Sequence, residues 1–155
     1  MPTIEERLQR LEDVEAIQRL QIRYAEVCDD GFDSDAIVDL FTPDGVWDCG
    51  DYGRFVGEEM RAYWADTARI TELSLHYMAN HVVDVEPSGT EAAGRCYMFG
   101  AVTRGGEAQW MAVRYDERYR KVDGEWRFTE MTLRPAFMTP FERSWALPVP
   151  SGEKS

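Results

Sequence analysis

Cationic side chains are scarce in this sequence. Lysine and arginine together number 17 against 29 aspartates and glutamates, which gives a formal net charge of −12 at pH 7. Nucleic acids and anionic membrane surfaces both require basic patches, so this balance argues against either as a partner. The sequence also lacks any apolar run near the roughly 20 residues of a membrane-spanning helix. We therefore expect a partner of another kind, such as a small molecule.

Cysteine and histidine are also few, which limits metal sites and disulfides. Cys28, Cys49 and Cys96 are widely spaced and contain no Cys-x-x-Cys pair, so they predict neither a disulfide framework nor a zinc site. The two histidines stand five residues apart in a strand-like run and cannot both ligate one metal. We expect no metal and no other cofactor. Free cysteines, and Glu5 and Glu6 where a signal peptide needs apolar residues, favour the cytoplasm.

Motifs for phosphate binding and for nucleophilic catalysis are missing too. The Gly105-Gly106 pair is typical of a hairpin turn, and no serine lies in a Gly-x-Ser-x-Gly motif. Cys28 precedes Asp29 and Asp30, whose negative charges raise the pKa of a thiol, so it is a poor nucleophile. Acid–base chemistry is the class that these absences leave open.

The first half of the sequence is predicted to be mainly helical. Thr3 and Glu6 form a capping box, and apolar residues then recur at intervals of three and four as far as Val27. This pattern predicts one long amphipathic helix, or two abutting helices of which the second restarts with Asp13 as its N-cap. Gly31 can end the helical segment by adopting the left-handed conformation. The elements expected next are a second helix over 34–41, a turn over 42–45, a strand over 46–48, its hairpin partner over 51–56 and a third helix from Glu58 or Glu59.

The second half is predicted to be an antiparallel sheet. Extended runs span roughly 74–86, 91–103, 107–121 and 125–137, with turn-forming residues between them. Helices followed by such a meander indicate one α+β domain over residues 1–147, with a flexible tail over 148–155. A curved sheet wrapped around the helices would form a cone, whose open mouth is a natural ligand site.

His76 is the candidate general base. Strand alternation places His76, Met78 and Asn80 on one face and His81 on the other, so only one histidine can point into the cone. With an unperturbed pKa of roughly 6.5, imidazole can take and return a proton near neutral pH. The alternative interpretation is a hydrogen-bonded histidine with a purely structural role.

A carboxylate at the end of the first helix is the expected partner of His76. Asp29 or Asp30 could hold the imidazole tautomer and stabilise the imidazolium, although a capping turn is the alternative role for both. Aromatic and other side chains would complete an apolar cavity. The residues expected to line it are Trp47, Phe55, Tyr63, Trp64, Met78, Asn80 and Met131.

The face of the sheet opposite His76 is expected to be covered. Tyr77, Ala79, His81 and Val83 would share this face, and the set is too apolar for a solvated surface. We therefore expect a homodimer or homotrimer in which His81 is an interface or structural residue.

The order of these features resembles a known family over residues 5 to 141. The matching positions are Tyr24, Asp29, the run 41–47, Gly57, His76, Asn80, Gly94, Arg95 and the run 123–126. The sequence is similar to the SnoaL-like branch of the nuclear transport factor 2-like (cystatin-like) superfamily. Within it, the resemblance is to bile acid 7α-dehydratase and hexachlorocyclohexane dehydrochlorinase.

The resemblance implies an α+β cone in which a histidine removes a proton and an aspartate supports it. The histidine is His76, and the aspartate is Asp29 when counted from Tyr24 or Asp30 when counted from the run 41–47; we prefer Asp29. A further family aspartate falls near Gly100.

The family's arginine falls near Met131 or Arg134, so Arg134 is one implied hydrogen-bond donor. Tyr24 is the other. The implied activity is a cofactor-independent dehydratase, other lyase, isomerase or cyclase. Its substrate would be a small hydrophobic molecule with a carbonyl or hydroxyl, such as a steroid, polyketide or aromatic catabolite. The alternative is a non-catalytic ligand-binding or oligomerisation module.

Overall fold

One long helix and four long strands account for most of the chain. The computed structural model describes residues 1–143 and 145. The elements in chain order are α1 (Ile4–Asp29), α2 (Ser34–Val38), β1 (Phe41–Asp48), a 3₁₀ turn (Gly50–Tyr52), β2 (Arg54–Val56), α3 (Glu59–Ile70), β3 (Thr71–Val85), β4 (Glu91–Arg104), β5 (Glu107–Val122) and β6 (Glu125–Pro140). The predicted domain end at residue 147 and the predicted tail over 148–155 lie outside the described residues.

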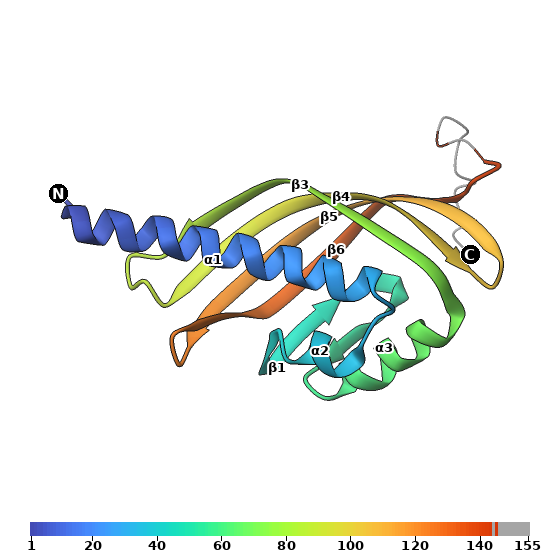
Figure 1. The fold of residues 1–155 in the computed structure, drawn as a ribbon, viewed down its shortest axis with the longest axis horizontal. Coiled ribbons are helices and arrows are strands. Elements are labelled where there is room, and N and C mark those ends of the chain that lie inside the picture. The colour runs from blue at the N-terminus through green and yellow to red at the C-terminus, as the bar shows by residue number, and fades with distance from the viewer. Residues whose placement is uncertain (144, 146–155) are drawn as a thin grey trace, which may run out of the picture.

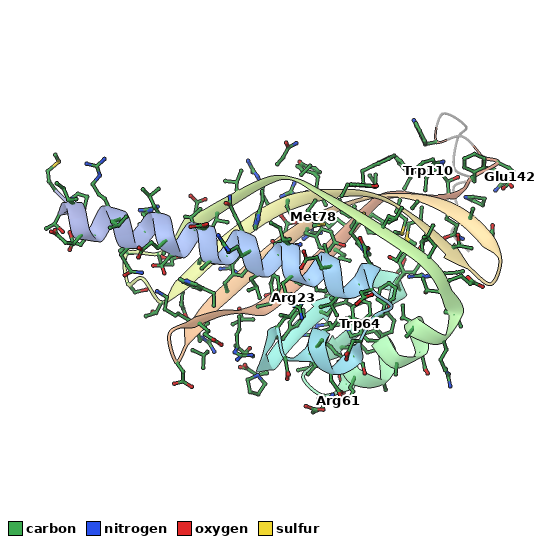
Figure 2. The ribbon with its side chains drawn as sticks, viewed as in Figure 1. Arg23, Arg61, Trp64, Met78, Trp110 and Glu142 are labelled. Atoms are coloured by element: carbon green, nitrogen blue, oxygen red, sulfur yellow. The ribbon has the colours of Figure 1, made fainter. Side chains whose placement is uncertain are left out.

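The strands of the described residues form one mixed sheet in the order β2-β1-β6-β5-β4-β3. β3 to β6 form the predicted antiparallel meander, whereas β1 pairs in parallel with β6 and antiparallel with β2. The sheet curves around α1, and α2 and α3 lie near the end of α1, opposite the curved strands (Figure 1). Trp64 extends from α3 into the space between these layers (Figure 2). The predicted α+β class is confirmed.

α1 begins as the sequence predicts and is anchored to the sheet near its middle. The Thr3 hydroxyl accepts the Glu6 N–H at 3.1 Å, and the Glu6 carboxylate accepts the Thr3 N–H at 2.7 Å. Asp13 is buried and accepts hydrogen bonds from Lys121 Nζ at 2.5 Å and Trp126 Nε1 at 3.0 Å. The apolar residues before this anchor are exposed, and they are Ile4, Leu8 and Leu11.

A bulge in β3 changes which side chains face the helices. The pairing of β3 with β4 shifts between Ala79 and Val82, and Asn80 has a left-handed backbone with φ of 54°. The extra residue reverses the alternation, so His81 turns inward and its Nε2 lies 3.1 Å from the Tyr119 hydroxyl. The prediction that the histidines lie on opposite faces, with His81 on the outer one, is wrong for this reason.

The segment after α2 also differs from the prediction. α2 ends at Val38, and the residues expected to form a turn over 42–45 belong to β1. The pairing of β1 with β6 is irregular between Phe41 and Val46. A kinked strand therefore replaces the predicted turn and short strand.

Candidate active site

His76 and Asp29 are in direct contact. Asp29 is the last residue of α1, and His76 lies in β3, which runs beside it. Nδ1 of His76 lies 2.6 Å from Oδ1 of Asp29, and the His76 backbone N–H donates to Oδ2 at 3.0 Å. Both oxygens of one carboxylate therefore fix one histidine, through its backbone and through its ring. Asp30 instead caps α1, with its N–H donating to the Glu26 carbonyl at 2.9 Å.

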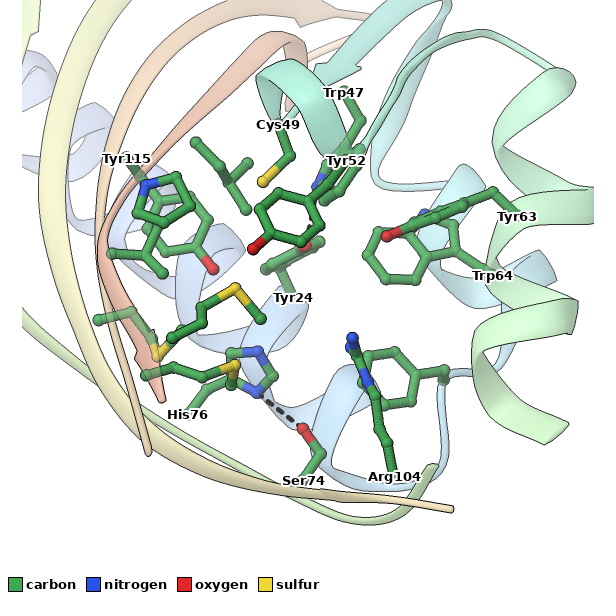
Figure 3. Close-up of a pocket in the computed structure, with 17 residues that line it drawn as sticks. Tyr24, Trp47, Cys49, Tyr52, Tyr63, Trp64, Ser74, His76, Arg104 and Tyr115 are labelled. Atoms are coloured by element: carbon green, nitrogen blue, oxygen red, sulfur yellow. Dashed lines mark hydrogen bonds between the residues drawn. The ribbon is translucent and has the colours of Figure 1, made fainter. Parts of the chain in front are cut away.

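The contact with Asp29 determines which ring nitrogen of His76 is left for chemistry. A carboxylate accepts a hydrogen from Nδ1, so the neutral ring carries its lone pair on Nε2. The Ser74 hydroxyl lies 3.3 Å from Nδ1 and helps to orient the ring. Nε2 has no hydrogen-bond partner among the described residues, and the ring projects into the pocket (Figure 3). The side chain of His76 is only 8% exposed.

The cavity beside His76 is enclosed mainly by aromatic and apolar side chains. It has a volume of about 580 Å³ including its open mouth. Trp47, Tyr63 and Trp64 pack against one another with ring centroids 4.9 to 5.2 Å apart, and Phe32 stacks on Trp64. The lining residues are Tyr24, Phe32, Trp47, Cys49, Tyr52, Tyr63, Trp64, Ser74, His76, Met98, Arg104, Met111, Val113, Tyr115, Leu133, Pro135 and Met138.

Two buried phenol groups face this cavity. Tyr24 extends from α1, and its hydroxyl accepts a hydrogen bond from Trp47 Nε1 at 3.2 Å, which leaves its own hydrogen to be donated. Tyr115 enters from β5 (Figure 3). Burial raises the pKa of Tyr24 and Tyr115 well above the usual value. Both therefore remain neutral hydrogen-bond donors over the physiological pH range.

Arg104 supplies a positive charge at the cavity. It is the last residue of β4 and shares the inward face with Met98 and Gly100. The guanidinium reaches into the pocket on the α3 side (Figure 3). Strand alternation carried to the end of the run predicts this inward position, whereas the family resemblance implies an arginine on the last strand.

Several predicted lining residues do line the cavity, and others pack behind it. Trp47, Tyr63 and Trp64 are in the first group. Phe55 lies behind this layer, stacked on Tyr63 at 4.4 Å. Met131 is fully buried in the core, and Met78 is partly buried against it.

Asn80 and Arg134 do not reach the cavity. Asn80 is exposed in the β3 bulge, because the reversed alternation moves it away from the inward face. Arg134 is on the outer face of β6, where its Nε donates to Asp116 Oδ2 at 2.9 Å. The prediction that Arg134 donates a hydrogen bond in the pocket is therefore wrong, because its side chain lies on the other face of the sheet.

Gly100 stands where the family resemblance implies a further aspartate. It pairs directly with His76 between β3 and β4. A Cβ at this position would lie 2.1 Å from the Leu75 carbonyl oxygen and 3.0 Å from Met98 Sδ. The backbone here has no room for an aspartate, so the strand beside His76 contributes no acid.

The SnoaL-like domain family matches residues 9–132, which is most of the chain. This chain belongs to the SnoaL-like family. No curated protein matches the sequence significantly.

Three solved structures show how far the likeness extends. A proposed aromatic ring hydroxylase from Novosphingobium aromaticivorans is 30% identical, with a TM-score of 0.78 over 84% of this chain and 94% of that one. A proposed scytalone dehydratase from the same organism is 21% identical (TM-score 0.79; 88% and 92%). A hexachlorocyclohexane dehydrochlorinase from Novosphingobium barchaimii is 20% identical (TM-score 0.77; 92% and 99%). The shared fold is the nuclear transport factor 2-like, or cystatin-like, fold.

The structure also bears on the cysteines, metals and membranes. Cys28, Cys49 and Cys96 are free and buried. In residues 1–143 and 145, no group of three or more histidine, cysteine or acidic side chains is arranged to hold a metal ion. None of the helices in this part of the chain is long and apolar enough to cross a membrane.

Proposed function

We propose that this SnoaL-like protein is an acid–base enzyme, a lyase or isomerase, that needs no cofactor. Its substrate is a small hydrophobic molecule with a carbonyl or hydroxyl group, such as a steroid, polyketide or aromatic catabolite. The observation that carries the proposal is the 2.6 Å contact between His76 and Asp29, with Nε2 of the histidine left for an aromatic cavity. A structural histidine has no need of a cavity at its second nitrogen.

In the proposed reaction, Nε2 of His76 removes a proton from a carbon next to the substrate carbonyl. Asp29 already holds Nδ1–H and stabilises the imidazolium that forms. A positioned base of this kind accelerates proton transfer by about 10²–10⁴-fold. The low polarity of the aromatic walls strengthens the attraction between the imidazolium and Asp29.

The electron pair from the broken C–H bond has two possible destinations. In an elimination it forms a C=C bond, the C–O bond to a β-hydroxyl breaks, and the departing oxygen takes a proton from the imidazolium and leaves as water. In an isomerisation the pair is delocalised onto the carbonyl oxygen as an enolate conjugated with a neighbouring C=C bond, and the double bond shifts when the imidazolium returns the proton to the far carbon. In this proposal Tyr24 and Tyr115, which both line the cavity, donate hydrogen bonds to the substrate oxygen that gains charge. The dehydratase and dehydrochlorinase names of two structural relatives both describe eliminations.

Carbon-bound deuterium exchange tests the proton transfer without knowledge of the natural substrate. A panel of cyclic ketones and β-hydroxy ketones is incubated with the protein in D₂O, and exchange and elimination are followed by NMR. For any compound that reacts, we expect His76→Ala to lower the rate by about 10²-fold or more. Asp29→Asn should have a similar effect, because its side chain offers one acceptor oxygen where two are needed.

Asp30→Asn is the matched control, since Asp30 contributes only its backbone to the helix end. It should keep the wild-type rate, and circular dichroism should show that all three variants are folded. Equal rates in His76→Ala and the wild type would contradict the proposal. That result would support a binding module with the same fold.

A further inference from the structure

Arg104 places an uncompensated positive charge at an apolar cavity. Its Nε is buried and has no hydrogen-bond partner among the described residues. None of the ion pairs in this part of the chain involves Arg104. The side chain as a whole is partly exposed. A guanidinium that is partly withdrawn from water is still costly unless an anion pairs with it. The chain leaves this requirement unmet, although its acidic residues greatly outnumber its basic ones.

Arginines elsewhere in the described residues differ from Arg104, because they have acidic partners. Arg61, Arg69, Arg114 and Arg134 each pair with an aspartate or glutamate at the protein surface. At the cavity, the carboxylate of Asp29 is already engaged by His76. The charge of Arg104 instead acts on neutral groups across the pocket, where it opposes the rise in pKa that burial causes at Tyr63 and Cys49.

We propose that the cavity binds a carboxylic acid with an aromatic or alicyclic body, whose carboxylate pairs with Arg104. The planar guanidinium can hold both carboxylate oxygens, and the aromatic walls fit a flat apolar body. A single negative charge is expected, because Arg104 is the one lysine or arginine among the described residues that line this cavity. This inference names the substrate class of the proposed enzyme and rests on that proposal for the reacting end of the substrate.

The carboxylate and the reacting carbon occupy different ends of the site. His76 pairs with Gly100 across the sheet, and Arg104 is four residues farther along β4. At the rise of an extended strand this is about 13 Å between backbone positions. Arg104 therefore anchors the substrate by the end remote from proton transfer, and it is a binding residue and not an acid or base.

A matched pair of ligands tests this anchor by calorimetry at pH 7.5. The probes are 2-naphthoate and 2-naphthamide, which share a flat body and differ in charge. The wild type should bind 2-naphthoate at least tenfold more tightly. Arg104→Gln should lose this preference and bind the two probes about equally, because its affinity for 2-naphthoate falls by about tenfold or more. Arg104→Lys keeps the charge without the two-pronged geometry and should keep a reduced preference.

Two controls separate this inference from the proposed function. Arg134→Gln removes an arginine from the outer face and should leave both affinities unchanged. His76→Ala should keep the preference for 2-naphthoate even though it loses proton transfer. Equal binding of the two probes by the wild type would overturn the inference. A preference for 2-naphthoate that survives in Arg104→Gln would also overturn it. The absence of that preference from a folded Arg104→Lys variant would do the same.

Discussion

Two carboxylates on the inner side of the fold have different surroundings and different roles. Asp29 keeps 29% of its side chain exposed and is tied to the histidine of the candidate site. Glu117 is fully enclosed, with its Oε2 2.5 Å from the Tyr119 hydroxyl and 3.6 Å from His81 Nε2. The Cys96 thiol lies 3.9 Å from both of its oxygens. This second cluster lies outside the cavity lining.

Burial determines the charge states in the Glu117 cluster. It raises the pKa of Glu117 to about 7, and the negative charge of Asp116 adds to the effect. Burial also lowers the pKa of His81 below its usual value. Both shifts favour the neutral form of the group, which weakens the 3.6 Å contact between His81 and Glu117 as an ion pair.

The raised pKa of Glu117 predicts a loss of stability as the pH rises from the acidic range to neutrality. The unfolded chain releases this proton near pH 4.5 and the folded chain near pH 7, so the free energy of unfolding falls as the pH rises through this window. Glu117→Gln removes the titration and can still accept from Tyr119. Relative to the wild type, it should gain about 2 kcal/mol of stability between pH 5 and pH 8. Urea unfolding at both pH values measures the difference, and an equal change in the two proteins would contradict the prediction.

At the level of elements, β3 shows where the alternation of inward and outward side chains predicts the structure and where, after the bulge, it does not. Ser74, His76 and Met78 face inward with the period of two that an extended strand imposes. After Asn80 the period shifts by one residue, and the inward position passes to His81. Asparagine adopts the left-handed conformation more readily than most residues, but it does so in only a minority of cases. The sequence alone therefore gives no reliable sign of the bulge.

Substitution of Asn80 tests whether its backbone conformation is needed. Asn80→Gly should leave stability within about 0.5 kcal/mol, because glycine enters the left-handed region freely. Asn80→Val should cost about 1–2 kcal/mol, since a β-branched residue is strained at this φ. Thermal or urea unfolding measures both. Ala79→Val, at the extended neighbour, is the control and should cost less; a larger loss there would point to side-chain packing instead.

The elements that the sequence predicts well are those with local signals. The capping box at Thr3 and the turn glycines between strands bring most boundaries within a few residues of their observed places. Helix register from Tyr24 correctly selects Asp29 as the residue in contact with His76. The parallel pairing of β1 with β6 joins segments about 80 residues apart, and no local pattern encodes it. The position of Arg104 likewise depends on which strands close the cavity.

At the level of the whole molecule, an apolar patch is exposed on the outer face of the sheet. Tyr77 is 65% exposed and pairs with Phe99 across β3 and β4, and Phe99 stacks on Trp110 at 5.5 Å. Leu75 and Tyr97 extend the same patch. Trp110 lies toward the end of the sheet remote from the start of α1 (Figure 2). Two separate apolar surfaces are therefore exposed, this patch and the first turns of α1.

A single chain seldom leaves apolar surfaces of this kind in water, so we propose a homodimer or homotrimer that covers the outer face. Light scattering at micromolar concentration should give a mass of two or three chains. Tyr77→Glu should shift the mass to one chain with no loss of helix by circular dichroism, because it places a charge at the centre of the patch. Ala65→Glu adds the same charge on the exposed side of α3 and should leave the assembly intact. A wild-type mass of one chain would contradict the proposal, since the exposed patch would then need a different partner to cover it.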